Sequence, residues 1–243
     1  MACAPRLARH SLQQGAGPWH SGQSGLRVER LWWSDGSVLY KESVGPQAAA
    51  RLVAARHGDT AWSLAGRHTG RSDVALEPSG IEQAMRLGKR LAGHPFSAVL
   101  VRPAKRAIET CAAAGFGARA EVCEDLWEWD YGRYEGLTTM EIRAERPGWS
   151  IWRDGVPGGE SIDGVAERAD RVVARVRATL GDVLVVAHAH LLRVLAARWV
   201  AMPASAGAHL VLQPATLSVL GWEREAPAIL SWNDGGPAPL GSA

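Results

Sequence analysis

The sequence predicts an α/β fold in which a mostly parallel central sheet is flanked by helices on both faces. Strands are expected at 51–55, 98–101 and 183–187, because each segment contains a short apolar run typical of a buried strand. Each predicted strand is followed along the chain by a segment in which apolar residues recur with helical spacing. This alternation of strands and helices favours parallel pairing of the strands. We therefore expect the carboxyl ends of the three strands to meet at one edge of the sheet, where ligands bind in such folds.

The other elements follow from local signals. Glu77-Pro78-Ser79-Gly80 predicts a helix start, and Pro103 predicts the start of a second helix. Amphipathic patterns predict helices over roughly 160–180 and 190–201. The apolar faces expected for the first three helices are Ile81, Ala84, Met85, Gly88 and Leu91; Ala107, Ile108, Cys111 and Ala114; and Ile162, Val165, Ala169, Val172, Val173 and Val176. Segments 217–220 and 229–232 predict late strands that are antiparallel or at an edge.

Four regions are expected along the chain. Residues 1–26 are rich in small and polar residues and show no periodicity, which predicts a disordered extension. Residues 27–49 contain two strand-like runs around Asp35-Gly36, which predicts a β-hairpin appendage. Residues 50–235 carry the alternating pattern of the main domain, and 236–243 are expected to be a flexible tail.

The composition of the chain indicates which classes of partner and which compartment to expect. The 243 residues carry 27 Lys and Arg against 25 Asp and Glu, so a net charge of +2 predicts neither nucleic acid nor a membrane as partner. No apolar run approaches the length needed to cross a membrane. The three cysteines show neither a CxxC pair nor metal-like spacing, which favours reduced thiols in the cytoplasm. Either a monomer or a homodimer fits these data.

Chemistry-bearing residues follow all three predicted strands. Arg56 and His57 follow the first, Arg106 lies in the first turn of the helix after the second, and His188 follows the third. Arginine forks and imidazoles suit a phosphoryl group, whose charge is spread over three oxygens. The absence of a Walker-type glycine loop in the sequence argues against a nucleoside triphosphate site of that kind.

A general acid is also needed to protonate a leaving alkoxide. Glu128 lies between two tryptophans in an acidic and aromatic stretch, and apolar neighbours and a bound phosphate would both raise the pKa of its carboxyl. Asp130 and Asp59 are the rival candidates. The pair His188 and His190 also forms an HxH pattern, but Leu191-Leu192 supplies no further metal ligand, so we expect no metal site here.

In five places the sequence resembles the histidine phosphatase superfamily, also called phosphoglycerate mutase-like. The matching motifs are Arg56-His57-Gly58-Asp59-Thr60, Arg106-Ala107-Ile108-Glu109-Thr110, Glu128-Trp129-Asp130-Tyr131-Gly132 with Glu135-Gly136-Leu137, Gly159-Glu160-Ser161, and Val185-Val186-Ala187-His188 with Leu192-Arg193. The resemblance implies that His57 is a nucleophile that forms a phosphohistidine. It implies that Arg56, Arg106 and His188 hold the phosphate, and that Glu128 is the proton donor. It implies no metal and no organic cofactor.

Departures from the family pattern refine this expectation. Ala189 replaces a glycine after the second histidine, Arg102-Pro103 replaces Ser-Pro, and Ser63 stands where many members carry asparagine. Ser63, Thr69, Gly70, Tyr131 and Ala189 are expected to line the substrate site. Trp127, Trp129, Trp149 and Trp152 lie close together in the sequence, and we expect these tryptophans either to fill the core or to form a pocket wall.

Within this superfamily, the sequence resembles the phosphatases more than the mutases. Thr139 stands where cofactor-dependent mutases carry a lysine, and the insertion that follows is short. We therefore expect hydrolysis of a small phosphorylated metabolite, such as a sugar phosphate or a sugar bisphosphate. The alternatives are a phosphoglycerate mutase-type phosphotransferase and a phospho-ligand binding protein with impaired catalysis.

Overall fold

The computed structural model describes residues 29–32, 38–41 and 50–236, and the chain divides into two units at Pro46/Gln47. In the first unit, β1 (Glu29–Trp32) pairs antiparallel with β2 (Val38–Lys41). The turn expected around Asp35-Gly36, the disordered extension predicted for 1–26 and residues 237–243 of the predicted tail lie outside the described residues.

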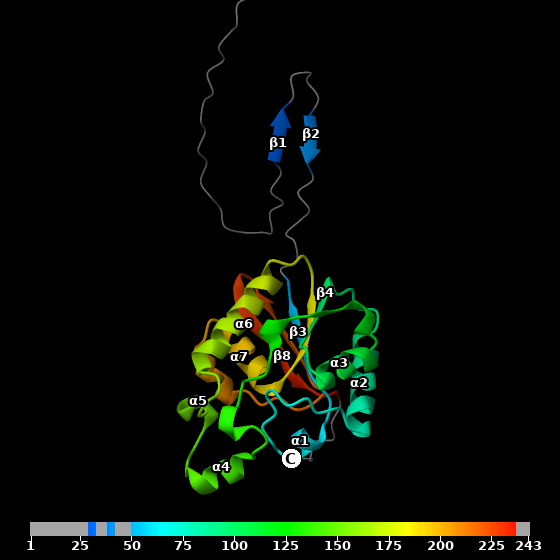
Figure 1. The fold of residues 1–243 in the computed structure, drawn as a ribbon. Helices are drawn as coiled ribbons and strands as arrows, with labels where there is room; N and C mark the ends of the chain where they lie inside the picture. Colours follow the sequence, from blue (N-terminus) through cyan, green and yellow to red (C-terminus); the bar gives the residue numbers. More distant parts are fainter. Residues whose placement is uncertain (1–28, 33–37, 42–49, 237–243) are drawn as a thin grey trace, which may run out of the picture. The chain divides into compact units, whose positions relative to one another are not determined.

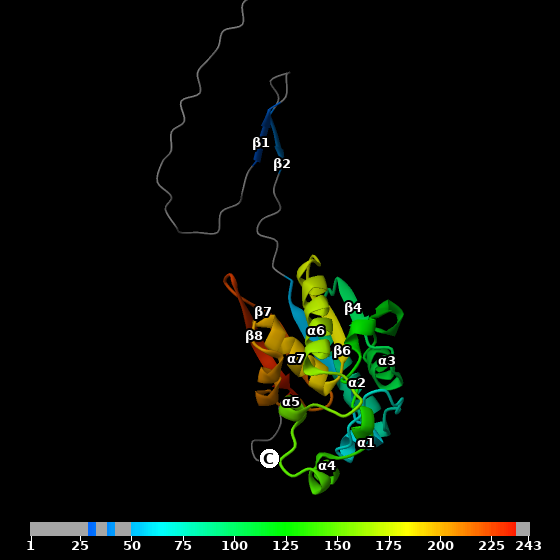
Figure 2. The ribbon, with the colours of Figure 1, turned by 60° about the vertical axis from the view of Figure 1, so that its left-hand side comes forward.

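The second unit contains a six-stranded sheet in the order β5, β4, β6, β3, β7, β8. Figure 1 labels β3, β4 and β8 of this sheet, and Figure 2 also labels β6 and β7. Its parallel part consists of β3 (Leu52–Arg56), β4 (Ala98–Val101), β5 (Ala120–Val122) and β6 (Val183–Ala187). β7 (Leu217–Glu223) and β8 (Ala226–Asp234) continue it antiparallel on the β3 side, as predicted. β5 is absent from the predicted strands because its three side chains are exposed or half-buried and form no apolar run.

Helices cover both faces of the sheet (Figures 1 and 2). On one face, α2 (Pro78–Leu91) and α3 (Lys105–Ala113) pack on a core cluster that includes Val53, Val99 and Val186. On the other, α6 (Ile162–Arg177) and α7 (Ala189–Trp199) contribute to a larger cluster that includes Val185. All five residues of β6 are buried, as two covered faces require. The fold is therefore the predicted α/β arrangement.

Short elements occupy the connections. They are α1 (Ala61–Leu64), α4 (Thr139–Glu145) and α5 (Ile151–Asp154), and the 3-10 turns Gly117–Arg119, Glu124–Leu126, Gly132–Tyr134 and Ala204–His209. Trp129, Trp149 and Trp199 are fully buried, so these three tryptophans fill the core.

The buried faces of α2 and α3 differ from the predicted ones. In α2, Ile81 and Met85 are about half exposed, and the residues that face the sheet are Gly80, Ala84, Leu87 and Leu91. A Cβ on Gly80 would lie 2.2 Å from the Asp59 carbonyl oxygen, so this close contact with the His57–Asp59 loop sets the rotation of α2.

A similar rotation occurs in α3. Ile108 is exposed, whereas Arg106 and Thr110 are buried with Ala107 and Cys111. Thr110 Oγ1 accepts a hydrogen bond from the Gly58 N–H at 3.1 Å. Polar contacts with the loop after β3 therefore override the apolar pattern on this helix. The face predicted for α6 is correct, with Val165, Ala169, Val172, Val173 and Val176 buried and Ile162 half-buried.

Candidate active site

The carboxyl ends of β3, β4 and β6 bring the predicted phosphate-binding residues together. β6 lies between β3 and β4 in the sheet, so Arg56 and His57 at the end of β3 become neighbours of His188 at the end of β6. The imidazole centroids of His57 and His188 are 4.8 Å apart. Arg106, at the second position of α3, reaches His188 from the β4 side, with its Nε 3.3 Å from His188 Nδ1.

His57 is held in one tautomer by its own loop. Its Nδ1 lies 2.7 Å from the Gly58 carbonyl oxygen, and because a carbonyl only accepts, Nδ1 must carry the proton. Nε2 is then left with a free lone pair. Burial and, after it, the positive charges of Arg56 and Arg106 lower the pKa of His57 well below its ordinary 6.5. A neutral imidazole with a free Nε2 is the form that a nucleophile needs.

Arg106 is fully buried and fixed by the loop 69–72. Its Nη1 donates to the Ser72 carbonyl oxygen and its Nη2 to the Thr69 carbonyl oxygen, both at 2.8 Å. Gly70, expected to line the substrate site, is buried instead. Its N–H donates to the carboxylate of Glu135, and its carbonyl oxygen accepts from Arg106. The loop is therefore a support for the arginine.

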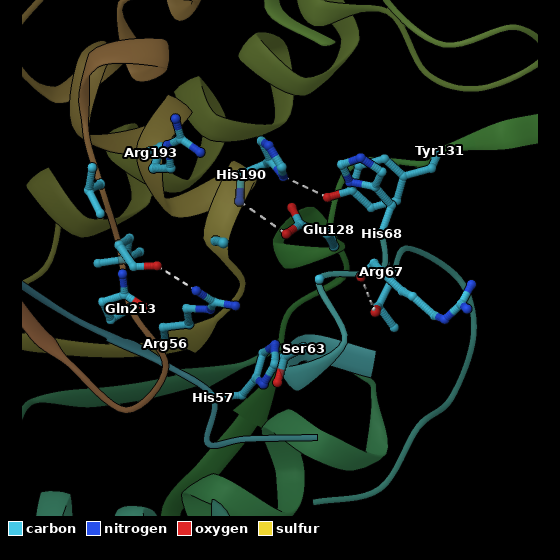
Figure 3. Close-up of a pocket in the computed structure, with 15 residues that line it drawn as sticks. Arg56, His57, Ser63, Arg67, His68, Glu128, Tyr131, His190, Arg193 and Gln213 are labelled. Carbon is cyan, nitrogen blue, oxygen red and sulfur yellow. Dashed lines mark hydrogen bonds between the residues drawn. The ribbon is translucent and has the colours of Figure 1, made fainter. Parts of the chain in front are cut away.

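An open cavity of about 300 Å³ lies beside His57 (Figure 3). Seven of the predicted site residues line it, five of them being His57, Glu128, Tyr131, Ser63 and Ala189. Arg56 and Thr69 line it as well, whereas Arg106 and His188 lie buried next to it. The other lining residues are Gly66, Arg67, His68, His190, Arg193, Val211, Leu212 and Gln213.

Glu128 is the carboxylate among the lining residues, and it is almost completely buried. Its Oε1 accepts from the backbone N–H groups of Trp129 and Leu191, each at 2.9 Å, and its Oε2 from that of His190 at 3.0 Å. Figure 3 shows the carboxylate between His190 and the loop that carries His57. Two of the three donors belong to the first turn of α7, where the helix dipole also stabilises a negative charge.

The two rival carboxylates are engaged elsewhere. Asp59 Oδ2 accepts from Gln83 Nε2 at 2.6 Å, and Asp130 Oδ1 accepts from the Gly132 N–H at 3.0 Å. Neither is among the lining residues of the cavity. Their positions leave Glu128 as the carboxyl that faces His57 across the cavity.

A set of uncharged aromatic groups forms the wall next to Glu128. Tyr131 Oη lies 2.7 Å from His190 Nδ1, and the rings of His68 and Tyr131 are 4.7 Å apart. Burial lowers the pKa of His190 well below 6.5 and that of His68 to about 4, and it raises the pKa of Tyr131. These groups are therefore neutral near pH 7 and serve as hydrogen-bonding partners rather than charges.

Arg168 on α6 anchors the acidic loop. It forms a partly buried pair with Glu160 at 2.7 Å, and its Nη1 donates to the carbonyl oxygens of Asp125 and Trp127, both at 2.8 Å. These bonds fix the backbone that leads directly into Glu128.

Several lining residues were not among the expected site residues, and Arg67, Leu212 and Gln213 are three of them. Gln213 and Leu212 come from the segment before β7, and Leu212 supplies the carbonyl oxygen to which Arg56 Nη1 donates. Arg67 directly precedes His68 and Thr69. Those two residues could be expected near the site because they follow the Arg56-His57 motif closely in the sequence. One sequence signal could have identified Gln213: it is a polar residue that follows an apolar segment in the last third of the chain.

Among the described residues, no three or more His, Cys, Asp and Glu side chains are grouped as metal ligands. His188 and His190 point to different partners, since His188 contacts the arginines and His190 contacts Tyr131. In the part of the chain that the structure describes, no helix has the length and apolar character needed to span a membrane.

Comparison with known proteins identifies the family. A model described as the histidine phosphatase superfamily, branch 1, matches residues 52–235. The chain belongs to this superfamily. Over 177 residues it is 41% identical to an acid phosphatase of Mycobacterium tuberculosis, which covers 71% of this chain and 87% of the relative. It is also 33% identical over 187 residues to sedoheptulose 1,7-bisphosphatase of Saccharomyces cerevisiae, covering 63% and 69% of the two chains.

Solved structures agree with the sequence comparison. The structure of an open reading frame product of Mycobacterium tuberculosis superimposes with a TM-score of 0.71 at 37% identity, over 77% of this chain and 99% of that one. The protein is thus an enzyme of the histidine phosphatase superfamily, a phosphoric monoester hydrolase with the phosphoglycerate mutase-like fold.

Proposed function

We propose that this histidine phosphatase hydrolyses a small phosphorylated metabolite, a sugar phosphate or sugar bisphosphate, through a phosphohistidine on His57. The observation that carries the proposal is the placement of a neutral His57 beside His188 and Arg106, with Glu128 facing it across the cavity. Arg56, with a pKa that burial lowers, adds a second guanidinium at the same strand end.

In the first step, the Nε2 lone pair of His57 attacks phosphorus and the bond from phosphorus to the substrate oxygen breaks. Arg56, Arg106 and His188 stabilise the phosphoryl oxygens, and Glu128 gives its proton to the departing oxygen. In the second step, the Glu128 carboxylate takes a proton from water as the water oxygen attacks phosphorus. The bond from phosphorus to Nε2 then breaks and inorganic phosphate leaves. The three backbone N–H groups on Glu128 support the carboxylate between these steps.

The cavity supports a substrate with a second anionic group. Arg67 and Arg193 line it together with Gln213, and its volume of about 300 Å³ is at the small end for metabolite sites. Cationic side chains on the wall beyond Arg56 suit a second phosphate or a carboxylate. The sedoheptulose bisphosphatase among the relatives supports the same substrate class. We also propose a cytoplasmic location, because the described cysteines, Cys111 and Cys123, are free and buried.

The nucleophile is tested with His57→Ala on an aryl phosphate, with His209→Ala, an exposed histidine, as the matched control. We expect no turnover and no acid-labile phosphoprotein in the first variant and normal turnover in the second. Full activity of His57→Ala would refute the mechanism. Wild-type protein that binds phosphate but never turns over would indicate a binding protein.

The proton donor is tested with Glu128→Gln on two substrates. An alkyl phosphate needs protonation of its leaving oxygen, whereas a nitrophenyl phosphate does not. We expect kcat to fall by about 10²–10⁴-fold on the alkyl ester and clearly less on the nitrophenyl ester. Equal losses on both would remove Glu128 from this role.

The substrate class is tested by a hydrolysis screen over sugar phosphates, sugar bisphosphates, phosphoglycerates and nucleotides. Arg193→Met is expected to raise KM about 10–100-fold for a bisphosphate and to leave KM for a monophosphate nearly unchanged. Efficient interconversion of phosphoglycerates, dependent on a bisphosphate primer, would favour the mutase-type alternative.

A further inference from the structure

Arg102 is a fully buried arginine that the mechanism above does not use. It is the residue directly after β4, at the place where the family pattern has serine. Its Nη2 donates to the Gly70 carbonyl oxygen at 2.7 Å, and its guanidinium lies over the Trp127 ring, 4.0 Å from the centroid. These contacts hold the group beside His188, whose Nε2 is 3.0 Å from Arg102 Nη1.

His188 cannot satisfy both of its arginine neighbours. Arg106 Nε faces His188 Nδ1 at 3.3 Å, and Arg102 Nη1 faces Nε2 at 3.0 Å. Burial lowers the pKa of His188 well below 6.5, so its ring is neutral and carries one proton on one of the two nitrogens. One of the two arginine contacts is therefore a donor facing a donor. An anionic oxygen that accepts from both groups removes this conflict.

A second observation is a further unsatisfied donor on the same guanidinium. Arg102 Nε is buried and has no hydrogen-bond partner among the described residues. Burial, and after it the charge of Arg106, lowers the pKa of Arg102 to about 9, as expected for a guanidinium without an anion. A buried donor without an acceptor is costly unless a ligand supplies one.

We propose that Arg102 is a third phosphate-binding arginine, which donates with His188 to a non-bridging oxygen of the substrate phosphoryl group. This inference rests on the proposed function, because it assigns the ligand of the same site. It adds a cation where the family pattern has a neutral hydroxyl, so the site favours a phosphate dianion and retains product phosphate more strongly.

The test is calorimetric binding of inorganic phosphate to wild-type protein and to Arg102→Ser, which restores the family residue. We expect phosphate affinity to fall about 10–100-fold, the change that loss of a charge-assisted hydrogen bond produces, and KM for an aryl phosphate to rise in parallel. Added guanidinium ion is expected to restore part of the lost affinity. Arg71→Ser is the matched control, because Arg71 lies over the same Trp127 ring at 4.4 Å but is half exposed.

Folded Arg102→Ser, checked by near-ultraviolet circular dichroism, with wild-type phosphate affinity would overturn the proposal. If this variant does not fold, Arg102→Lys decides, because it keeps the charge and the buried stem. It should bind phosphate about 3–10-fold more weakly, and unchanged affinity would again overturn the proposal. Phosphate binding needs no turnover, so a protein that binds phosphate through Arg102 without hydrolysing esters would contradict the proposed function alone.

Discussion

Lowering the pH from 7 to 4 is expected to destabilise the folded protein, and His68 allows one part of this effect to be isolated. The His68 ring packs against Tyr131 and Trp149, with centroid distances of 4.7 and 5.7 Å. Burial in this setting lowers its pKa from 6.5 to about 4. Between these pH values the unfolded chain binds a proton at His68 that the folded chain does not.

The sign and size of the effect follow from proton linkage. Stability rises with pH wherever the unfolded state binds more protons, so the His68 contribution is intact above pH 6.5 and is lost as the pH falls towards 4. A difference between 6.5 and about 4, at ~1.36 kcal/mol for each pKa unit, corresponds to about 3 kcal/mol. Domains of this kind are stable by only ~5–15 kcal/mol, so one histidine accounts for a measurable share.

The assay is urea unfolding followed by tryptophan fluorescence at pH 7, 6, 5 and 4, for wild type and His68→Gln. We expect the free energy of unfolding of the variant to depend less steeply on pH, with the difference between the two proteins changing by about 3 kcal/mol across the series. Carboxylates titrate in both proteins and cancel in the comparison. His209→Gln, which replaces an exposed histidine, should follow the wild-type curve. Parallel curves for wild type and His68→Gln would refute the reasoning.

Three further predictions concern the loops around the site. The pKa of His57 is held well below 6.5 by burial and by Arg56, so histidine resonances in NMR should show His57 still neutral at pH 5.5, and a midpoint near 6.5 would contradict this. Gly58→Ala places a Cβ 2.4 Å from the Gly80 carbonyl oxygen and should cost at least ~2 kcal/mol in thermal unfolding. Gly164→Ala, whose Cβ would meet only side-chain atoms, the nearest on Glu160 at 3.2 Å, should cost clearly less than Gly58→Ala. Arg168→Met removes the partly buried pair and two loop bonds, so we expect a loss of ~2–4 kcal/mol and a lower kcat with phosphate affinity retained; unchanged kcat would show that the loop needs no such anchor.

The ends of the parallel strands β3, β4 and β6 could be predicted from the sequence because each one follows a continuous run of buried apolar residues. Such runs are short, end abruptly at a charged or aromatic-ring residue, and fix which side chains reach the edge of the sheet. Arg56, His57 and His188 could be placed together for this reason, without any knowledge of tertiary contacts.

The rest depended on contacts between distant segments. Arg56 donates to the carbonyl oxygen of Leu212, 156 residues further along the chain, and no local pattern indicates such a bond. The rotation of α2 is set by contact between Gly80 and Asp59, and that of α3 by the burial of Arg106, so both differ from the most apolar face. Arg102 stood out in the sequence only as a departure from the family pattern, and its contact with His188 needed the tertiary structure.

The position of β6 has a consequence for how activity arises. In sequence it is the last of the four parallel strands, yet in the sheet it separates β3 from β4. Until residues 183–187 insert, no strand lies between β3 and β4 to pair with both of them, and His188 is missing from the phosphate site. Pairing over such long separations is slow compared with helix formation. A ribosome-bound chain that lacks the last quarter of the domain should therefore be inert, and in refolding the return of turnover should lag behind the return of helical circular dichroism.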